Sequence, residues 1–158
     1  MRALVQRVSE ASVEISSANY SASIGKGIVI LLGVRDGDTK DDVIFVADKC
    51  SNLRIFSKRD SLGTGEDENG KMNFSVKDVD GEVLVISQFT LYGDTRKGNR
   101  PNFTDAAKPE LAEELYNKFI DRLKQNLGSD KIKSGIFAAM MLVKIFNDGP
   151  VTILVESK

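Results

Sequence analysis

The sequence contains no histidine and only one cysteine, Cys50. The absence of histidine excludes the Ser-His-Asp and Cys-His arrangements, in which an imidazole activates the nucleophile. It also removes the commonest protein ligand of zinc and related metals. An enzyme with this composition must rely on carboxylates, hydroxyls, backbone donors or the substrate itself, and we expect no metal and no other cofactor.

A lone cysteine cannot form an internal disulfide, so a reducing compartment is the simple expectation. No apolar run approaches the roughly 18–20 residues that a membrane-spanning helix needs, and polar residues interrupt the N-terminal segment too early for a secretory signal. We therefore expect a cytoplasmic protein with no membrane partner. The net charge of −1 argues against global attraction to nucleic acid, so any such contact must come from a local basic patch.

The 158 residues fit a single domain, residues 1–158, that is long enough to bury a core without disulfides or metal. Apolar alternation and apolar runs indicate the strands. The expected strands are an N-terminal hairpin within 3–15, a strand at 28–34 buried on both faces, short strands at 53–56 and 72–76, a strand at 82–91 after an Asp80-Gly81 turn, and two strands at 136–146 and 151–155 joined by a turn.

Helical spacing of apolar residues predicts two main helices, at 40–52 and 109–127. Thr39 and Asp42 have the spacing of a capping box, Pro109 suits a first turn, and Gly128 suits a C-terminal stop. The polar residues 57–71 predict a mobile surface loop. Strands and helices together predict an α/β protein of the α+β type, with a mixed or antiparallel sheet.

Three segments carry the side chains that could support chemistry. The first, Ser87-Gln88-Phe89-Thr90-Leu91, places hydroxyls and an amide at the end of an apolar strand. Ser87 and Thr90 are three residues apart, so a regular strand cannot put both on one face, whereas a bend would bring both to one site. Chemistry alone favours the simpler interpretation, a strand that ends in hydroxyl residues.

The second segment is Asn147-Asp148-Gly149-Pro150-Val151-Thr152. Gly-Pro is common in turns, and a plain turn is the simpler interpretation of these residues. A cis Gly149-Pro150 bond would direct consecutive carbonyls the same way, but cis is the minority state of X-Pro bonds.

The third segment, Arg96-Lys97-Gly98-Asn99-Arg100, is compact and basic in a nearly neutral chain. Arg96, Lys97 and Arg100 suit contacts with nucleic-acid phosphates. A solvated loop explains the same residues, because surface charges usually need no partner.

Taken together, these segments resemble the D-aminoacyl-tRNA deacylases of the bacterial and general eukaryotic type, also known as the D-tyrosyl-tRNA(Tyr) deacylase family. The resemblance runs nearly end to end. It is carried by residues 1–8, 31–34 with 37–39, 52–56, 87–93, 97–101 with Phe103, 135–141 and 147–152.

The resemblance implies a layered β-β-α sandwich and an editing hydrolase. Its substrates would be D-aminoacyl-tRNA and glycyl-tRNA mischarged on tRNA(Ala). It further implies a homodimer with active sites at the interface, and a cis Gly149-Pro150 that reaches into the partner's pocket, where its carbonyls exclude an L side chain. Asn147 and Ala138 would belong to this substrate site, and Phe137 and Met141 would line the adenosine pocket.

The family mechanism needs no histidine, because the 2′-hydroxyl of the terminal adenosine assists the attacking water. Backbone donors around Phe89 and Thr90 would stabilise the developing oxyanion. Ser87 and Gln88 would hold the substrate amino group or the adenosine. Thr90 lacks a visible base, so we assign its hydroxyl a structural or polarising role.

Two features depart from the family pattern. Ala138 stands where the family usually has glycine, and the loop at 57–71 is several residues longer than usual. Two alternatives stay open, of which the first could arise from the extra methyl group of Ala138. One is a tRNA-binding protein of the same family with weakened catalysis, and the other is a hydrolase of other activated esters.

Overall fold

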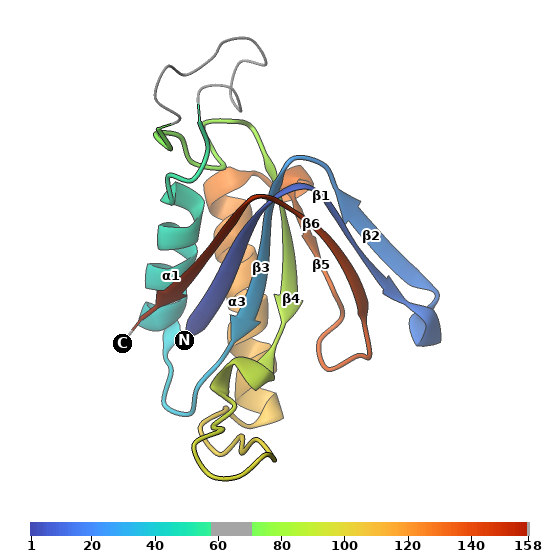
Figure 1. The fold of residues 1–158 in the computed structure, drawn as a ribbon, viewed down its shortest axis with the longest axis vertical. Coiled ribbons are helices and arrows are strands. Elements are labelled where there is room, and N and C mark those ends of the chain that lie inside the picture. The colour runs from blue at the N-terminus through green and yellow to red at the C-terminus, as the bar shows by residue number, and fades with distance from the viewer. Residues whose placement is uncertain (58–70, 158) are drawn as a thin grey trace.

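Strand β1 (Arg2–Ile15) organises the sheet of the computed structural model, which describes residues 1–57 and 71–157. In these ranges the chain forms a six-stranded sheet and two long helices (Figure 1). The remaining elements are β2 (Tyr20–Ile24), β3 (Gly27–Gly33), α1 (Lys40–Asn52), β4 (Glu82–Ser87), α3 (Pro109–Leu127), β5 (Ile132–Ser134) and β6 (Leu142–Glu156), with short 3-10 turns η1 (Ser16–Ala18), η2 (Phe89–Tyr92) and η3 (Ser129–Lys131).

The length of β1 makes the sheet fold over on itself. Along one edge, residues 2–8 of β1 pair with β3 and residues 11–15 pair with β2, while β6 follows the other edge. All three pairings are antiparallel, whereas β4 runs parallel to β3 and β5 runs parallel to β4. Strand β2 and residues 11–15 of β1 form an arm of the sheet. The Tyr20 hydroxyl of β2 donates to the carbonyl of Ser134 over 2.8 Å, which joins this arm to β5.

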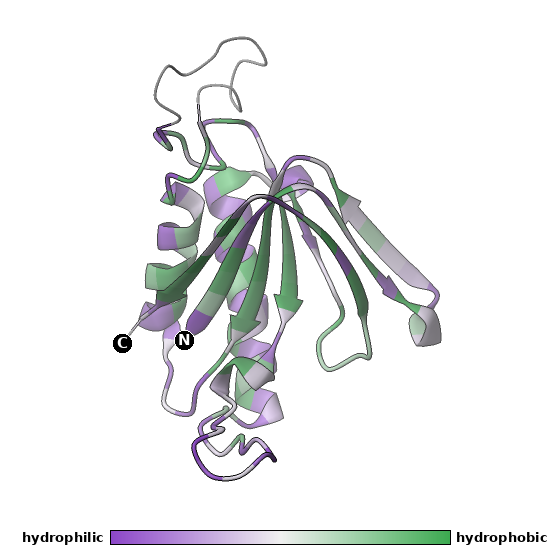
Figure 2. Cartoon of the chain, in the orientation of Figure 1, coloured by the Kyte–Doolittle hydropathy of each residue, from purple (hydrophilic) through white to green (hydrophobic). Residues whose placement is uncertain are grey.

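The folded sheet creates two buried layers. Ile28, Ile30 and Leu32 of β3 pack in the core that includes the helices, whereas Val29 packs in a second core under the arm. Alternate residues of one strand therefore face different cores, as period-two geometry requires. Figure 2 shows the resulting hydrophobic β3 and β4 beside helices of mixed hydropathy. The mixed sheet, the two helices and the β-β-α layering are confirmed.

Both helices lie where the sequence predicts them. The backbone N–H of Thr39 donates to the Asp42 carboxylate over 2.8 Å, as in a capping box. Pro109 opens α3, and Gly128 ends it with φ of +99°. No helix in the described part of the chain is long and apolar enough to span a membrane.

Two strand predictions in the first half of the chain need correction. Residues 3–15 do not contain a hairpin, because β1 runs unbroken through them and the chain reverses only at η1 before β2. Residues 53–56 and 72–76 contribute a single bridge, Phe56 to Phe74, in place of two strands. The loop predicted at 57–71 falls almost wholly on residues 58–70, which lie outside the described residues.

Two more corrections concern the functional segments. The strand predicted at 82–91 ends at Ser87. The Asp80-Gly81 turn does not form a hairpin, because Phe74 in the segment before it bridges Phe56, whereas β4 after it pairs in parallel with β3 and β5. The two strands predicted around Asn147–Pro150 are one strand, β6. Both halves of β6 pair with β1 in the same antiparallel sense, so the chain bulges at this point and does not reverse.

Candidate active site

A cavity of about 680 Å³ opens where the parallel strands β3 and β4 end. This volume lies in the range of ligand pockets, about 300–1,000 Å³. Ser87 and Gln88 give the wall its polar groups, and the other lining residues are apolar or aromatic. Besides these two, the cavity is lined by Leu32, Val34, Ile86, Phe89, Phe103, Ala106, Ala107, Pro109, Ala112, Tyr116, Phe137, Ala138, Ala139, Met140, Met141 and Val143.

The chain bends sharply at Gln88, at the mouth of this cavity. Its backbone N–H still donates to the Leu32 carbonyl over 2.7 Å, after which the chain turns into η2. Gly33 allows the turn to pack closely, since a Cβ there would lie 3.1 Å from the Gln88 carbonyl oxygen. The bend brings the Gln88 amide to the Thr90 hydroxyl, to which it donates a hydrogen bond. Such a bend is one of the two alternatives that the sequence leaves open for this segment.

Thr90 itself does not line the cavity. Its hydroxyl accepts from the Gln88 amide, and that amide cannot remove the proton of a hydroxyl nucleophile. Phe89 and Thr90 are the first two residues of η2, so their backbone N–H groups have no carbonyl partner within the turn. The local structure therefore leaves backbone donors at this bend.

The segment 135–141 forms the opposite wall. The Gly135 backbone N–H donates to the Val85 carbonyl over 2.9 Å, and the Tyr116 hydroxyl of α3 lies 3.0 Å and 3.3 Å from the Val85 and Gly135 carbonyls. Phe137 packs against the Tyr116 ring at a centroid distance of 5.8 Å. Sequence reasoning missed Tyr116, because a tyrosine beside the apolar stripe of a helix looks like an ordinary core residue.

Met141 and Ala138 shape this wall from two sides. The Sδ atom of Met141 packs directly over Gly135, where a Cβ would lie 2.4 Å from it. Ala138 has φ of +57°, in the left-handed region that a non-glycine residue seldom occupies. Ala138 is one of the residues that line the cavity.

The Gly149-Pro150 peptide bond is cis and lies in the bulge of β6, outside the cavity of its own chain. The Asn147 side chain organises the bulge. Its carbonyl oxygen accepts from the Val151 backbone N–H at 3.2 Å, and its amide donates to the Thr152 hydroxyl at 2.9 Å. Asn147 therefore shapes the segment that carries Gly149-Pro150 and does not line the cavity.

The basic loop adjoins the cavity through its base. Asp94 and Asn102 exchange backbone hydrogen bonds of 2.7 Å and 2.9 Å, which close the loop between them. Within the loop, Arg96 is held by the Asp94 carboxylate at 2.9 Å and 2.7 Å, and these bonds lower the pKa of Asp94 to about 2. Lys97 and Arg100 are exposed side chains of the same loop.

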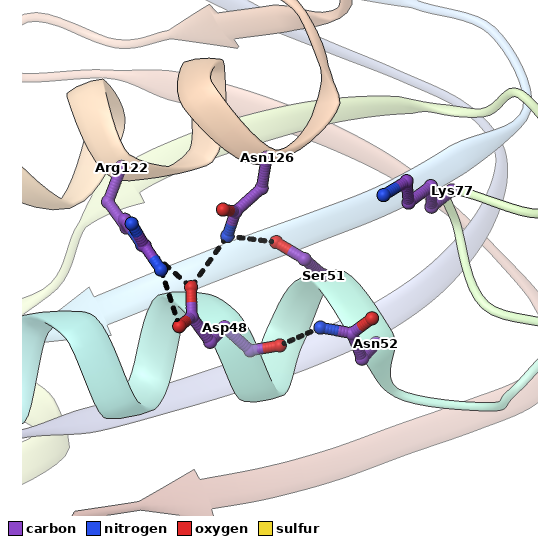
Figure 3. A pocket seen from close by; sticks show the side chains of 6 residues that line it. All are labelled: Asp48, Ser51, Asn52, Lys77, Arg122 and Asn126. Carbon is purple, nitrogen blue, oxygen red and sulfur yellow. Dashed lines mark hydrogen bonds and ion pairs between the residues drawn. The ribbon is translucent and has the colours of Figure 1, made fainter.

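A second hollow, of about 240 Å³, lies between α1 and α3 (Figure 3). Figure 3 shows Arg122 and Asn126 of α3 directed toward Asp48 and Ser51 of α1. Arg122 donates to both Asp48 carboxylate oxygens at 2.7 Å, and Asn126 donates to Asp48 at 2.8 Å and to Ser51 at 3.1 Å. The network joins the two helices, so we interpret it as a structural contact. Sequence reasoning did not predict it.

The sequence as a whole has clear relatives. Residues 4–156 match the family model of D-Tyr-tRNA(Tyr) deacylase. The chain belongs to this family. Proteins named D-aminoacyl-tRNA deacylase are 52% identical in Carboxydothermus hydrogenoformans, over 99% of both chains, and 53% identical in Caldicellulosiruptor saccharolyticus, over 100% of this chain and 98% of the relative.

Two solved structures have the same fold as this chain. The c-Myc DNA unwinding element binding protein superimposes with a TM-score of 0.86 at 42% identity, over 100% of this chain and 99% of its own. A second structure, described as a probable eukaryotic D-amino acid tRNA deacylase, gives a TM-score of 0.82 over 98% of both chains. At 15% identity, the second likeness supports the fold alone. The predicted family membership is confirmed.

Proposed function

We propose that this chain is a cytoplasmic editing hydrolase that cleaves the ester of D-aminoacyl-tRNA to free D-amino acid and tRNA. The observation that carries the proposal is the cavity where β4 ends, which combines Ser87 and Gln88 with an apolar opposite wall. The family assignment supports the same substrate, since the curated relatives are named D-aminoacyl-tRNA deacylase.

The reaction needs little acid-base chemistry from the protein, because an aminoacyl ester is already activated. Water adds to the ester carbonyl carbon, the backbone N–H groups of Phe89 and Thr90 stabilise the resulting oxyanion, and the ribose oxygen leaves with a proton. The 2′-hydroxyl of the terminal adenosine assists the water. Ser87 and Gln88 hold the substrate amino group or the adenosine, whose base lies between Phe137 and Met141.

Rejection of L-aminoacyl-tRNA requires a second copy of the chain. Within the described residues β6 pairs with β1 alone, so its other edge is open, and an open edge readily pairs with another chain. Leu142, Phe146 and Leu154 on β6 are 58%, 55% and 49% exposed. In the proposed homodimer, Gly149 and Pro150 reach the partner's cavity and their carbonyls exclude an L side chain, which leaves room for glycine.

A tRNA-binding protein with weakened catalysis is the second candidate. Two observations favour it: the Ala138 methyl group in the cavity wall, and the similarity to a protein named for binding a DNA element. Such a protein would bind charged tRNA without hydrolysing it faster than buffer.

The deciding experiment follows hydrolysis of D-tyrosyl-tRNA, L-tyrosyl-tRNA and glycyl-tRNA(Ala) by the purified protein. We expect rapid loss of the D-amino acid and of glycine, and no acceleration for the L-substrate. If D-tyrosyl-tRNA and glycyl-tRNA(Ala) are lost no faster than in buffer while tRNA still binds, the second candidate replaces the first. Equal rates for the D- and L-substrates would reject the chiral selection.

The dimer is tested separately by light scattering on the parent and on Leu154→Asp. We expect a dimer for the parent and a monomer with little activity for the variant, because a charge on the open edge opposes pairing. Ile44→Asp supplies a control, since it puts the same charge on an apolar residue that is 45% exposed on α1 and not on β6. A monomeric parent with full activity and full chiral selection would exclude the shared site.

A further inference from the structure

Phe89 lies at the rim of the cavity with 59% of its surface exposed. Its ring contacts Phe103 at a centroid distance of 5.1 Å and an interplanar angle of 70°, an edge-to-face arrangement. Phe137, on the opposite wall, pairs with Tyr116 instead. The cavity therefore has two separate aromatic groups, and the proposed adenosine site uses only the one at Phe137.

The Phe89–Phe103 pair lines the cavity and adjoins the base of the basic loop. Phe103 follows directly on Asn102, which closes the loop with Asp94. Gly93 brings the two segments together, because a Cβ there would lie 3.0 Å from the Phe103 ring and 3.0 Å from the Thr90 carbonyl. Exposed Lys97 and Arg100 lie farther along the same loop.

An exposed aromatic ring with exposed cations on an adjoining loop is a common composition of a site for single-stranded nucleic acid. Bases stack on the ring and the cations follow the phosphates, with little preference for sequence. The exposed part of the Phe89 ring is not removed from water on folding, so it contributes no hydrophobic stabilisation to the fold. Stacking of a base on the ring would bury this surface. Because the two rings line the same cavity as the proposed adenosine site, the base that reaches them would belong to the nucleotide next to the terminal adenosine.

We propose that Phe89 and Phe103 form a stacking platform for the base of the nucleotide that precedes the terminal adenosine. The 3′ end then passes from the cavity over this platform, and Lys97 and Arg100 contact the phosphates beyond it. This inference rests on the proposed function and adds a second nucleotide subsite to it. The platform accepts any base, because stacking does not depend on base-edge hydrogen bonds.

The test compares minimal substrates of increasing length. D-tyrosyl esters are prepared on adenosine, on the dinucleotide CpA, and on a dinucleotide whose first sugar carries no base. For the parent we expect kcat/KM to rise roughly fivefold to a hundredfold from the abasic dinucleotide to CpA, the range that base–aromatic stacking supplies. In Phe89→Leu and Phe103→Leu, the ratio of kcat/KM for the CpA ester to kcat/KM for the abasic ester should fall toward one.

The measured quantity is the ratio between substrates in one variant, so a change in basal rate at Phe89 does not affect it. Phe45→Leu is the matched control, because Phe45 is 47% exposed on α1 and does not line the cavity. Its ratio should equal that of the parent. A second readout replaces the first base of CpA by a purine, which should not lower kcat/KM in the parent.

Two outcomes overturn the inference. One is a parent that hydrolyses the abasic dinucleotide as fast as CpA, and the other is Phe89→Leu and Phe103→Leu variants that keep the full ratio. A different result would assign the rings to the amino-acid side chain instead. In that case the two variants lose the difference in KM between D-tyrosyl and D-alanyl esters but keep the ratio of kcat/KM between CpA and the abasic dinucleotide. Failure of the proposed function is distinguishable, since the parent would then hydrolyse none of these esters.

Discussion

Arg7 on β1 donates a hydrogen bond from Nε to the backbone carbonyl of Asp148 on β6, over 3.2 Å. The same guanidinium donates from Nη1 to the carbonyl of Ile55 over 2.7 Å, and only 13% of the side chain is exposed. One largely buried cation thus joins the β6 bulge, the facing strand and the segment after α1. The position of the Arg7 side chain also requires glycine at position 149, since a Cβ on Gly149 would lie 2.8 Å from Nη2 of Arg7.

We expect Arg7→Lys to lower the free energy of unfolding by about 2 kcal/mol, because hydrogen bonds to charged groups contribute about 1.5–3 kcal/mol. A lysine cannot reach two carbonyls with a planar fork. Urea denaturation measures the loss, and the D-to-L rate ratio should fall with it because the bulge loosens. Arg35→Lys is the control, as its ion pair with Asp105 spans 3.9 Å at the surface. An Arg7→Lys protein as stable as the parent would contradict the role.

Ala138→Gly should lower KM for D-aminoacyl-tRNA, because it removes a methyl group from the cavity wall. It should leave the free energy of unfolding within about 1 kcal/mol of the parent, since relief at φ of +57° is offset by added freedom in the unfolded chain. Asn19→Gly provides the control at φ of 47°, in the turn after η1. It should show the same stability effect with unchanged kinetics. Identical kinetics for Ala138→Gly would show that the methyl group does not crowd the substrate.

Neutralising Lys97 or Arg100 should weaken tRNA binding and reduce the steepness of log K against log salt by about 0.7–0.9 for each phosphate that the variant no longer neutralises. Neutralising Arg96 should change this slope less, because the Asp94 carboxylate already occupies its guanidinium. Filter binding or fluorescence titration at several salt concentrations measures the slopes. Equal slopes for the parent and the Lys97 and Arg100 variants would show the loop to be an ordinary solvated loop.

Asp48 should stabilise the fold at neutral pH and stop doing so in acid. The Arg122 hydrogen bonds hold the pKa of Asp48 below its ordinary 3.8 in the folded protein. Burial opposes this shift, and the Asn126 hydrogen bond and the charge of Arg122 lower the pKa further. A carboxyl with a depressed folded pKa contributes stability above its unfolded pKa, and this is lost as pH falls through the folded value.

Asp48→Asn should therefore be clearly less stable than the parent at about pH 6, and the difference should shrink at an acid pH below the ordinary pKa of 3.8. Chemical denaturation at both pH values measures the difference. Asp121→Asn is a control on the same helix as Arg122, because the Asp121 carboxylate is 68% exposed and pairs loosely with Lys124 at 3.7 Å. A destabilisation by Asp48→Asn that is the same at both pH values would contradict the titration.

Local signals were sufficient for the helices. Thr39 with Asp42 marks the start of α1, and Pro109 and Gly128 mark the two ends of α3. These signals act within a few residues, so these three helix ends could be predicted without the fold. The uniformly apolar run of β3 likewise predicted a strand buried on both faces. The predicted family membership also came from the sequence, because the two signatures occur in order within one continuous resemblance.

The sheet connections could not be predicted in this way. Asn147-Asp148-Gly149-Pro150 has the composition of a turn, and its behaviour as a bulge depends on pairing with β1, more than 100 residues away. The predicted strand at 82–91 failed for a similar reason, since Gln88 bonds to Leu32 while the chain turns away at η2. Hydrogen-bond partners distant in sequence decide these cases, and turn propensity does not encode them.

The sequence by itself determined the helices, the buried central strand, the family and the absence of a histidine-based mechanism, because composition, caps and periodicity are local properties. Only the tertiary structure decided that Ser87, Gln88 and Phe89 face Phe137, Ala138 and Met141 across one cavity. It alone placed Phe103 against Phe89 and Arg7 against the bulge that carries Gly149-Pro150. These neighbours meet because β1 is long enough to pair with three strands and fold the sheet, and that pairing is a property of the whole chain.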